Sequence, residues 1–317
     1  MLCAITGKGI EGGNQMTAEI IDGKAIAAEL TEKVKTEIAN TGIRPHLVAV
    51  LVGEDPASIY YADSQKKSAE EVGIAYTLDK LPATTTQDQL IARIEKLNTD
   101  TEVTGIIMLV PLPKGIDAGV VQQYVDYTKD VEGITPTSLG LLLQDRPHLV
   151  PCTALAAVEI LQRTVGRLEG LDVTVLGRSV TVGRPVAVLL LSKSAKRNCT
   201  VTVCHTATRD LAGKVRQADV LVAAAGVAEF VKGSWIKPGA VVIDVGINRI
   251  PVLDANGQPV LDAKGKKKIK TVGDVEFETA KEVSSKITPV PGGVGSMTTA
   301  ILMQNTLLAA KLLQRRR

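Results

Sequence analysis

Short runs of apolar residues alternate along the chain with segments in which apolar side chains recur every three or four positions. The runs 47–52, 105–110 and 173–176 predict buried strands. The four-residue step from Ile26 to Leu30, repeated further on, predicts an amphipathic helix. Strands that alternate with helices imply a mainly parallel sheet covered on both faces, so the chain is predicted to be an α/β protein.

Cap and turn residues place several element ends in the first half. Asp55 followed by Pro56 is a good helix start, since aspartate caps the first N–H groups and proline needs none. Gly73 ends this helix, predicted over 57–72. Pro111 and Pro113 end the strand before them, because proline cannot donate to a ladder. Further strand and helix signals follow at 74–78 and 90–97, and a helix is predicted over about 118–127.

A change of domain is predicted near residues 150–153, after which the alternation is repeated. The predicted elements are strand 173–176, helix 184–195, strand 200–204, helix 208–217, strands 220–224 and 240–245, and a final helix at about 297–313. Residues 251–270 interrupt the pattern. Their two near-duplicate segments, 252–257 and 260–265, have turn residues at matching places and predict a surface hairpin with a solvated lysine edge at 266–268.

The stretch 171–185 is the strongest candidate for a cofactor site. A strand here turns through Gly177, Arg178 and Ser179 into a helix after Gly183. Free backbone N–H groups and the positive end of the helix dipole at such a turn favour a phosphate group. The spacing departs from the common G-x-G-x-x-G pattern, with serine in the second place and one extra residue, so a plain structural turn is the alternative.

The end of the strand 200–204 indicates which nicotinamide cofactor fits. Folds that prefer NAD often have an acidic residue there for the ribose hydroxyls. This chain has His205 and Thr206 instead. Because Thr206 and Arg178 would not repel a 2′-phosphate, the sequence favours NADP. The alternative for Thr206 is a cap on the next helix.

The loop 288–298 contains two prolines and three glycines in a short space. Such a loop is rigid and lets a ligand approach its backbone closely, which favours a binding role, although a structural loop is the alternative. On the helix 57–72, Tyr61, Gln65 and Ser68 share one face. That face either lines a cleft or is simply the solvated side.

The composition of the chain restricts the class of protein to which it can belong. The chain has 317 residues, enough for two domains, with 45% hydrophobic and 22% charged residues, as in globular proteins. A net charge of +3 does not indicate nucleic-acid binding, and no apolar run reaches membrane-spanning length. Scattered cysteines and histidines predict no metal site and a cytoplasmic location with reduced thiols. Residues 1–15 do not resemble a signal peptide, and Met16 is an alternative start to Met1.

Several motifs in one order together resemble the methylenetetrahydrofolate dehydrogenase/methenyltetrahydrofolate cyclohydrolase family. The resemblance covers nearly everything from Met16 to the last helix, except the 251–270 insert. The matching segments are 53–73, 105–113, 129–133 (Lys-Asp-Val-Glu-Gly), 151–153 (Pro-Cys-Thr), 177–185, 242–249, 272–275 and the Pro-Gly-Gly-Val-Gly loop at 291–295.

The resemblance implies two domains and a homodimer. After an N-terminal extension (1–15), a folate-binding catalytic domain comprises 16–152 and 297–317, so the last helix returns to it. A Rossmann-like NADP domain comprises 153–296. Tetrahydrofolate one-carbon derivatives are the implied substrates. The implied substrate residues are Tyr61, Glu132, Pro291, Gly292 and Gly293, and the implied NADP residues are Gly177, Arg178, Ser179, Gly183, Thr206 and Ile247.

Three family catalytic positions are altered in this chain. Gln65 stands where the family has the proton-transferring lysine, four residues after Tyr61. Leu109 replaces a glutamine, and Glu132 replaces an aspartate. Hydride transfer needs no acid or base, whereas cyclohydrolysis does. We therefore expect dehydrogenase activity with weak or lost cyclohydrolase activity. The alternative is a catalytically silent paralogue that binds NADP or folate and acts through a partner.

Overall fold

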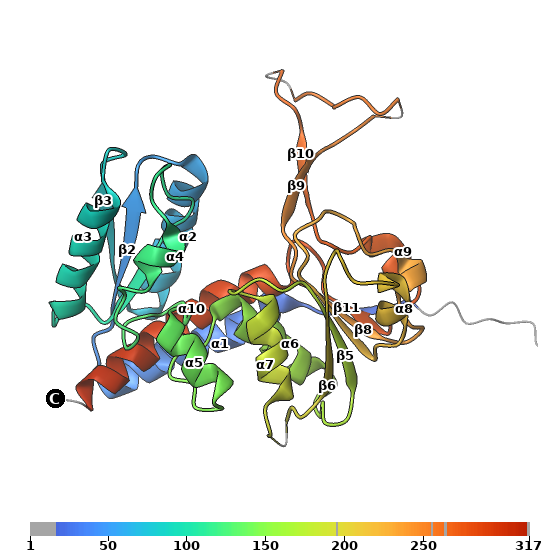
Figure 1. The fold of residues 1–317 in the computed structure, drawn as a ribbon, viewed down its shortest axis with the longest axis horizontal. Coiled ribbons are helices and arrows are strands. Elements are labelled where there is room, and N and C mark those ends of the chain that lie inside the picture. Colours follow the sequence, from blue (N-terminus) through green and yellow to red (C-terminus); the bar gives the residue numbers. More distant parts are fainter. Residues whose placement is uncertain (1–16, 195, 255, 263–264, 316–317) are drawn as a thin grey trace, which may run out of the picture.

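The computed structural model describes residues 17–194, 196–254, 256–262 and 265–315, and the extension 1–15 with both possible starts lies outside these residues. Two parallel sheets lie at opposite ends of the molecule, with long helices between them (Figure 1). This arrangement confirms the predicted α/β class. None of the described helices is both long and apolar enough to cross a membrane.

The smaller sheet is formed by the first half of the chain. Its strands are parallel and lie in the order β3-β2-β4. The central strand β2 is almost wholly buried, as its continuous apolar sequence predicts. The elements of this unit are β2 (His46–Val52), α2 (Pro56–Val72), β3 (Ala75–Leu81), α3 (Gln87–Thr99), β4 (Gly105–Met108) and α4 (Ala118–Gln122).

The larger sheet has six parallel strands in the order β1-β11-β8-β7-β5-β6. Its edge strand β1 comes from the start of the described chain, although every other strand follows residue 170. No pattern along the chain predicts this pairing, because β1 has only two residues. The strands are β1 (Glu19–Ile20), β5 (Asp172–Leu176), β6 (Thr200–Cys204), β7 (Val220–Ala223), β8 (Val241–Asp244) and β11 (Lys286–Ile287).

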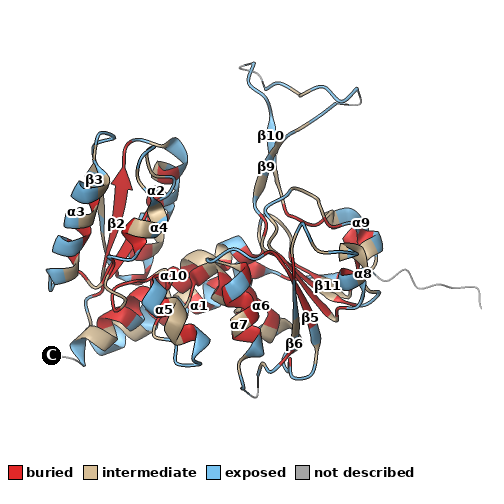
Figure 2. Cartoon of the chain, viewed as in Figure 1, coloured by how far each residue is buried: buried red, intermediate tan, exposed pale blue. Residues whose placement is uncertain are grey.

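Helices α1 and α10 run along the molecule between the two sheets. α10 packs against both α1 and α6, and buried residues concentrate where these helices meet (Figure 2). The final helix therefore contacts elements from both halves of the chain. The remaining helices are α1 (Gly23–Thr41), α5 (Pro136–Leu143), α6 (Cys152–Val165), α7 (Gly183–Leu191), α8 (Leu211–Arg216), a 3₁₀ turn η1 (Gly233–Trp235), α9 (Phe277–Lys281) and α10 (Val294–Gln314).

Helix α4 is shorter than the sequence pattern predicts. The pattern extends to about residue 127, but the helix ends at Gln122. Asn98 on α3 explains the early end, because its side chain donates to the Tyr124 carbonyl and accepts from the Asp126 amide. These two bonds hold the segment after Gln122 in a non-helical conformation, so the helix does not continue.

The insert forms an arm that projects from the body (Figure 1). Its stem pairs β9 (Asn248–Pro251) with β10 (Ile269–Val272) in an antiparallel ladder. Beyond the stem the chain forms two separate lobes, bridged at Leu253–Pro259 and Leu261–Lys267, in place of the single hairpin that the sequence predicts.

Candidate active site

The predicted cofactor turn lies between β5 and α7, at the carboxyl end of the sheet. Gly177 has a φ of 131°, and a Cβ atom there would collide with the carbonyl of Ala224, the residue that follows the neighbouring strand β7. A Cβ on Gly183 would collide with the carbonyl of Gly177. Both glycines therefore let the backbone fold tightly at the start of the helix, as a phosphate-binding turn requires.

Ser179 accepts from the amides at the start of α7, including that of Arg184, which donates to the Ser179 carbonyl at 3.1 Å. The Ser179 hydroxyl accepts from the amides of Val182 and Gly183 at 3.2 and 3.3 Å. Arg178 and Ser179 are exposed beside them. A tight turn, a serine hydroxyl, an exposed guanidinium and a helix start fit the phosphates of a dinucleotide.

Thr206 lies exposed in the turn that directly follows β6. The alternative that it caps the next helix is wrong. Asp210 caps α8, with its carboxylate accepting from the Gly213 amide at 3.1 Å. Thr206 is thus free of a capping role and stays a candidate for the ribose side of the cofactor.

A small cavity of about 70 Å³ brings the two halves of the chain together. Tyr61 on α2 and Glu132 line it with Thr181, which belongs to the cofactor turn. The cofactor turn is therefore next to the predicted substrate residues. The full lining is Tyr61, Ile107, Glu132, Ile134, Cys152, Thr153, Thr181, Thr298 and Leu302.

The titratable groups of this cavity favour their neutral forms. Burial, with a smaller contribution from the nearby Asp130, raises the pKa of Glu132 to about 8. Burial likewise raises the pKa of Tyr61 to about 12, with a contribution from Glu132. Burial and the two carboxyl groups raise the pKa of the Cys152 thiol. At neutral pH the Glu132 carboxyl can therefore donate a hydrogen bond.

Gln65 and Leu109 do not line this cavity. Gln65 is fully buried, and its Oε1 accepts from the Tyr76 hydroxyl at 3.2 Å. Its Nε2 has no hydrogen-bond partner among the described residues. Leu109 is 3% exposed and belongs to the apolar core. Of the two altered positions, Gln65 thus contributes an amide donor that is not used, and Leu109 contributes only an apolar side chain.

No lysine among the described residues lines the cavity. Lys66 pairs with Glu70 on the exposed side of α2. Lys129 is buried elsewhere, where its ammonium donates to the carbonyls of Leu97 and Asp100 at 2.9 and 2.7 Å. Neither supplies the amine that Gln65 lacks.

The Pro-Gly-Gly loop lines a second, wider cavity of about 520 Å³. Pro291, Gly292 and Gly293 face it together with Ile247, which is 64% exposed. Tyr60 of α2 lines this cavity, whereas Tyr61 lines the smaller one. Ile247 and the loop are close neighbours, since a Cβ on Gly295 would lie 3.2 Å from the Ile247 side chain. A predicted cofactor residue and the predicted substrate loop therefore meet here.

Buried polar groups hold the loops that carry the cavity residues. Asn305 on α10 donates to the carbonyls of Val131 and Val150 at 2.8 and 2.9 Å. The Asp130 carboxylate accepts from the Thr135 amide and the Ser138 hydroxyl, both at 2.7 Å. These bonds position Glu132 and Cys152, which flank the contacted carbonyls.

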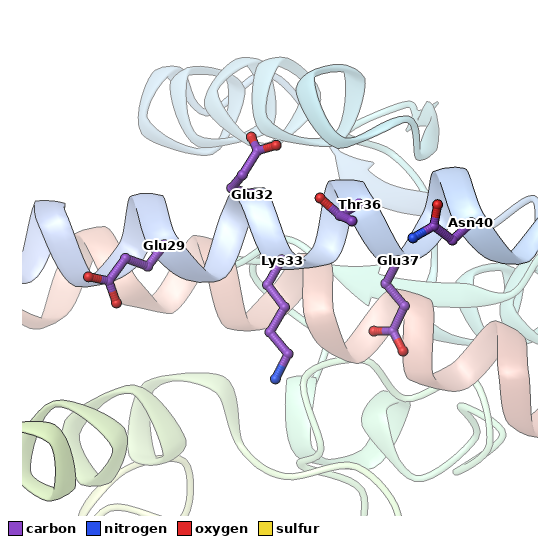
Figure 3. Close-up of a pocket in the computed structure, with 6 residues that line it drawn as sticks. All are labelled: Glu29, Glu32, Lys33, Thr36, Glu37 and Asn40. Atoms are coloured by element: carbon purple, nitrogen blue, oxygen red, sulfur yellow. The ribbon is translucent and has the colours of Figure 1, made fainter.

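Neither Thr181 nor Thr298 was predicted from the sequence as an individual site residue. Thr181 lies inside the predicted cofactor turn, but its position in the small cavity depends on how the two units face each other. Another hollow, on the exposed side of α1, contains none of the predicted site residues (Figure 3). Among the described residues no group of three or more metal-ligating side chains is present.

The fold and the site define a two-unit α/β protein with a candidate dinucleotide turn on one unit and candidate ligand residues on the other. Its first part, residues 21–132, matches the model of the tetrahydrofolate dehydrogenase/cyclohydrolase catalytic domain. Residues 151–314 match the NAD(P)-binding domain of the same family. The chain belongs to the tetrahydrofolate dehydrogenase/cyclohydrolase family, which confirms the resemblance and the predicted nicotinamide cofactor.

Known relatives cover nearly the whole chain. The bifunctional protein FolD of Dichelobacter nodosus is 48% identical over 304 residues, which are 94% of this chain and 99% of the relative. The FolD structure from Campylobacter jejuni has a TM-score of 0.82 at 38% identity, covering 93% of this chain and 99% of that one. The Trypanosoma brucei FolD structure, a complex with NADP and an inhibitor, has a TM-score of 0.82 at 37% identity and covers 94% and 99%.

Proposed function

We propose that this protein oxidises 5,10-methylenetetrahydrofolate to 5,10-methenyltetrahydrofolate with NADP. Membership of the family supports the reaction class. The observation that carries the proposal is the small cavity in which Thr181 of the cofactor turn meets Tyr61 and Glu132. A nicotinamide and a folate one-carbon bridge held there would be neighbours.

The cofactor supplies the chemistry, since nicotinamide accepts a hydride directly from carbon. The task left to this chain is to hold two rings in contact and exclude water. Tyr61 and the neutral Glu132 carboxyl would orient the folate, and Gly177, Ser179 and Gly183 would hold the phosphates. None of these tasks requires a group that changes its protonation during the step.

The second activity typical of the family is proposed to be weak or absent. Cyclohydrolysis needs a group that moves protons near neutral pH. Gln65 has no such proton equilibrium, and the apolar Leu109 offers no polar support. The methenyl product is therefore expected to accumulate.

Paired assays test the proposal. NADPH formation from methylenetetrahydrofolate and hydrolysis of methenyltetrahydrofolate are measured on the same preparation. We expect the first and little of the second. Absence of NADPH or NADH formation with either cofactor would refute the dehydrogenase proposal.

A second candidate, a silent paralogue that binds NADP or folate, is favoured by the three altered positions alone. Calorimetry that finds tight ligand binding beside zero turnover would support it. The dehydrogenase proposal has three further parts. We propose that the protein prefers NADP to NAD, that it forms a homodimer and that it is located in the cytoplasm. The absence of a carboxylate at Thr206 supports the first of these.

A further inference from the structure

One buried carboxylate connects two segments at the carboxyl end of the larger sheet. Asp274 lies two residues after β10 and is fully buried. Its Oδ2 accepts from the backbone amides of Ala225 and Gly226, at 2.6 and 2.8 Å. Its Oδ1 accepts from the side-chain amide of Asn248 at 2.9 Å. Asp274 therefore ties the segment that follows β7 to the segment that follows β8.

Hydrogen bonds alone satisfy this carboxylate. Among the described residues, no lysine, arginine or histidine forms an ion pair with Asp274. Its own backbone is held too, because its amide donates to Asp244 Oδ1 at 3.0 Å and its carbonyl accepts from Val231 at 2.9 Å. A buried carboxylate without a counter-ion is costly unless its N–H donors stay in place. The segments that supply these donors are therefore fixed relative to one another.

The position of Ile247 depends on these bonds. Its side chain is 64% exposed, so packing in the core does not hold it. The residues on either side of it are held instead. The Gly246 amide donates to the Asp244 carboxylate at 2.9 Å, and Asn248 donates to Asp274. The two buried carboxylates thus fix the backbone that places Ile247 in the wider cavity beside the Pro-Gly-Gly loop.

The order of the strands indicates which half of a dinucleotide these segments face. The candidate phosphate turn follows β5, and Thr206 follows β6 at the edge of the sheet. On the other side of β5 lie β7 and then β8. A dinucleotide lies across the carboxyl ends of such parallel strands. If its adenosine half is towards β6, its nicotinamide half lies towards β7 and β8, where Asp274 holds both connecting segments.

We propose that Asp274 is a positioning residue for the nicotinamide half of NADP. It lines neither of the two candidate cavities, so it acts through the groups that it holds. By fixing Asn248 and the amides of Ala225 and Gly226, it places Ile247 and the segment after β7 around the site of hydride transfer. This inference rests on the proposed dehydrogenase function and adds a residue that does not itself touch either ligand.

An exchange of two side chains tests this role. Asn248→Asp sets a second carboxyl group against Asp274 and removes the amide donor. The double variant Asn248→Asp/Asp274→Asn restores one donor and one acceptor between the two positions. Its new amide can donate to the new carboxylate, while the amide oxygen still accepts from Ala225 and Gly226. Both side chains keep nearly their original volume, so the exchange changes the hydrogen bonding and leaves the packing in place.

Calorimetry with two ligands separates the halves of the cofactor, because adenosine 2′,5′-bisphosphate has no nicotinamide. Asn248→Asp should raise the Kd for NADP by about fivefold or more, and should change the Kd for the bisphosphate by less than about twofold. The double variant should recover most of the NADP affinity. The control is Asp219→Asn, at the amino end of β7, where the carboxylate accepts from the Asp172 amide at 3.0 Å. It should leave both affinities unchanged.

The possible failures have different meanings. An unchanged NADP affinity in Asn248→Asp, or an equal loss of affinity for both ligands, would overturn the positioning role. A double variant that binds NADP as weakly as the single variant would overturn it as well, because the contact with Asp274 would not then explain the loss. Failure of the unmodified chain to bind either ligand would refute the proposed use of NADP and, with it, this inference.

Discussion

Gln65 is buried on α2, where its oxygen accepts from the Tyr76 hydroxyl and its nitrogen finds no partner among the residues that the structure describes. An unused buried donor has a cost of about 1–3 kcal/mol, which a bound ligand or a better partner would recover. The residue at this position therefore has more influence on the site than its lack of cavity contact suggests.

Replacing Gln65 by lysine tests its role. Gln65→Lys alone should restore little cyclohydrolase activity, because the apolar Leu109 offers an ammonium no polar support. Gln65→Lys with Leu109→Gln should restore more, since the new amide can support the amine. Hydrolysis of methenyltetrahydrofolate is the measurement, with dehydrogenase rate as the internal control. Hydrolysis by the unmodified chain as fast as its dehydrogenase turnover would show that another residue moves the proton.

Thr206 gives a test of cofactor choice. Thr206→Asp should shift the preference from NADP towards NAD, because a carboxylate at the end of β6 repels a 2′-phosphate. The ratio of kcat/KM values for the two cofactors is the measurement. Thr202→Asp, exposed on the same strand, is a suitable control. An unchanged ratio in Thr206→Asp would remove Thr206 from the cofactor site.

The raised pKa of Glu132 predicts that the stability of the folded chain depends on pH. Its folded pKa of about 8 lies above its ordinary value of 4.5, so the folded chain keeps a proton that the unfolded chain loses between these values. Its contribution to stability is therefore full below about pH 4.5 and falls as the pH rises through 8. Thermal melts should show Glu132→Gln gaining stability relative to the unmodified chain from pH 5 to 8.5. Parallel melting curves would contradict the raised pKa.

At the scale of elements, apolar runs and caps predicted most of the fold. Asp55 and Pro56 do start α2, and Gly73 ends it in the left-handed conformation. The predictions failed where a side chain distant in sequence determines the end of an element, as Asn98 does for α4. They also failed where an element is too short to show a pattern, as β1 is. The substrate and cofactor candidates came from local motifs, but the meeting of Thr181 with Tyr61 depends on packing between units, which no local pattern contains.

Asn305 connects α10 to both loops behind the small cavity. Asn305→Ala should lower the free energy of unfolding by about 1–3 kcal/mol, because the Val131 and Val150 carbonyls each lose this donor. The KM for folate should rise more than the KM for NADP, since the contacted loops carry Glu132 and Cys152. Gln304→Ala on the same helix is the control. Equal changes in both KM values would indicate a general loss of structure.

At the scale of the whole molecule, the two units are joined by more than one crossing of the chain. β1 belongs to the larger sheet although the smaller unit follows it directly in sequence. α10 returns after the larger sheet is complete and packs on α1. Each unit therefore depends on a segment from the opposite end of the chain, which limits how far the cavities between them can open.

The edge position of β1 has a consequence for anyone who wishes to produce the nucleotide-binding half by itself. A fragment cut at residue 151 would leave the hydrogen-bonding groups of β11 bare, and a bare strand edge invites other chains to add to it. We expect such a fragment to aggregate, and a synthetic peptide spanning 17–22 added during refolding to keep it in solution. The half-enzyme becomes a separable module only if its first strand is supplied with it.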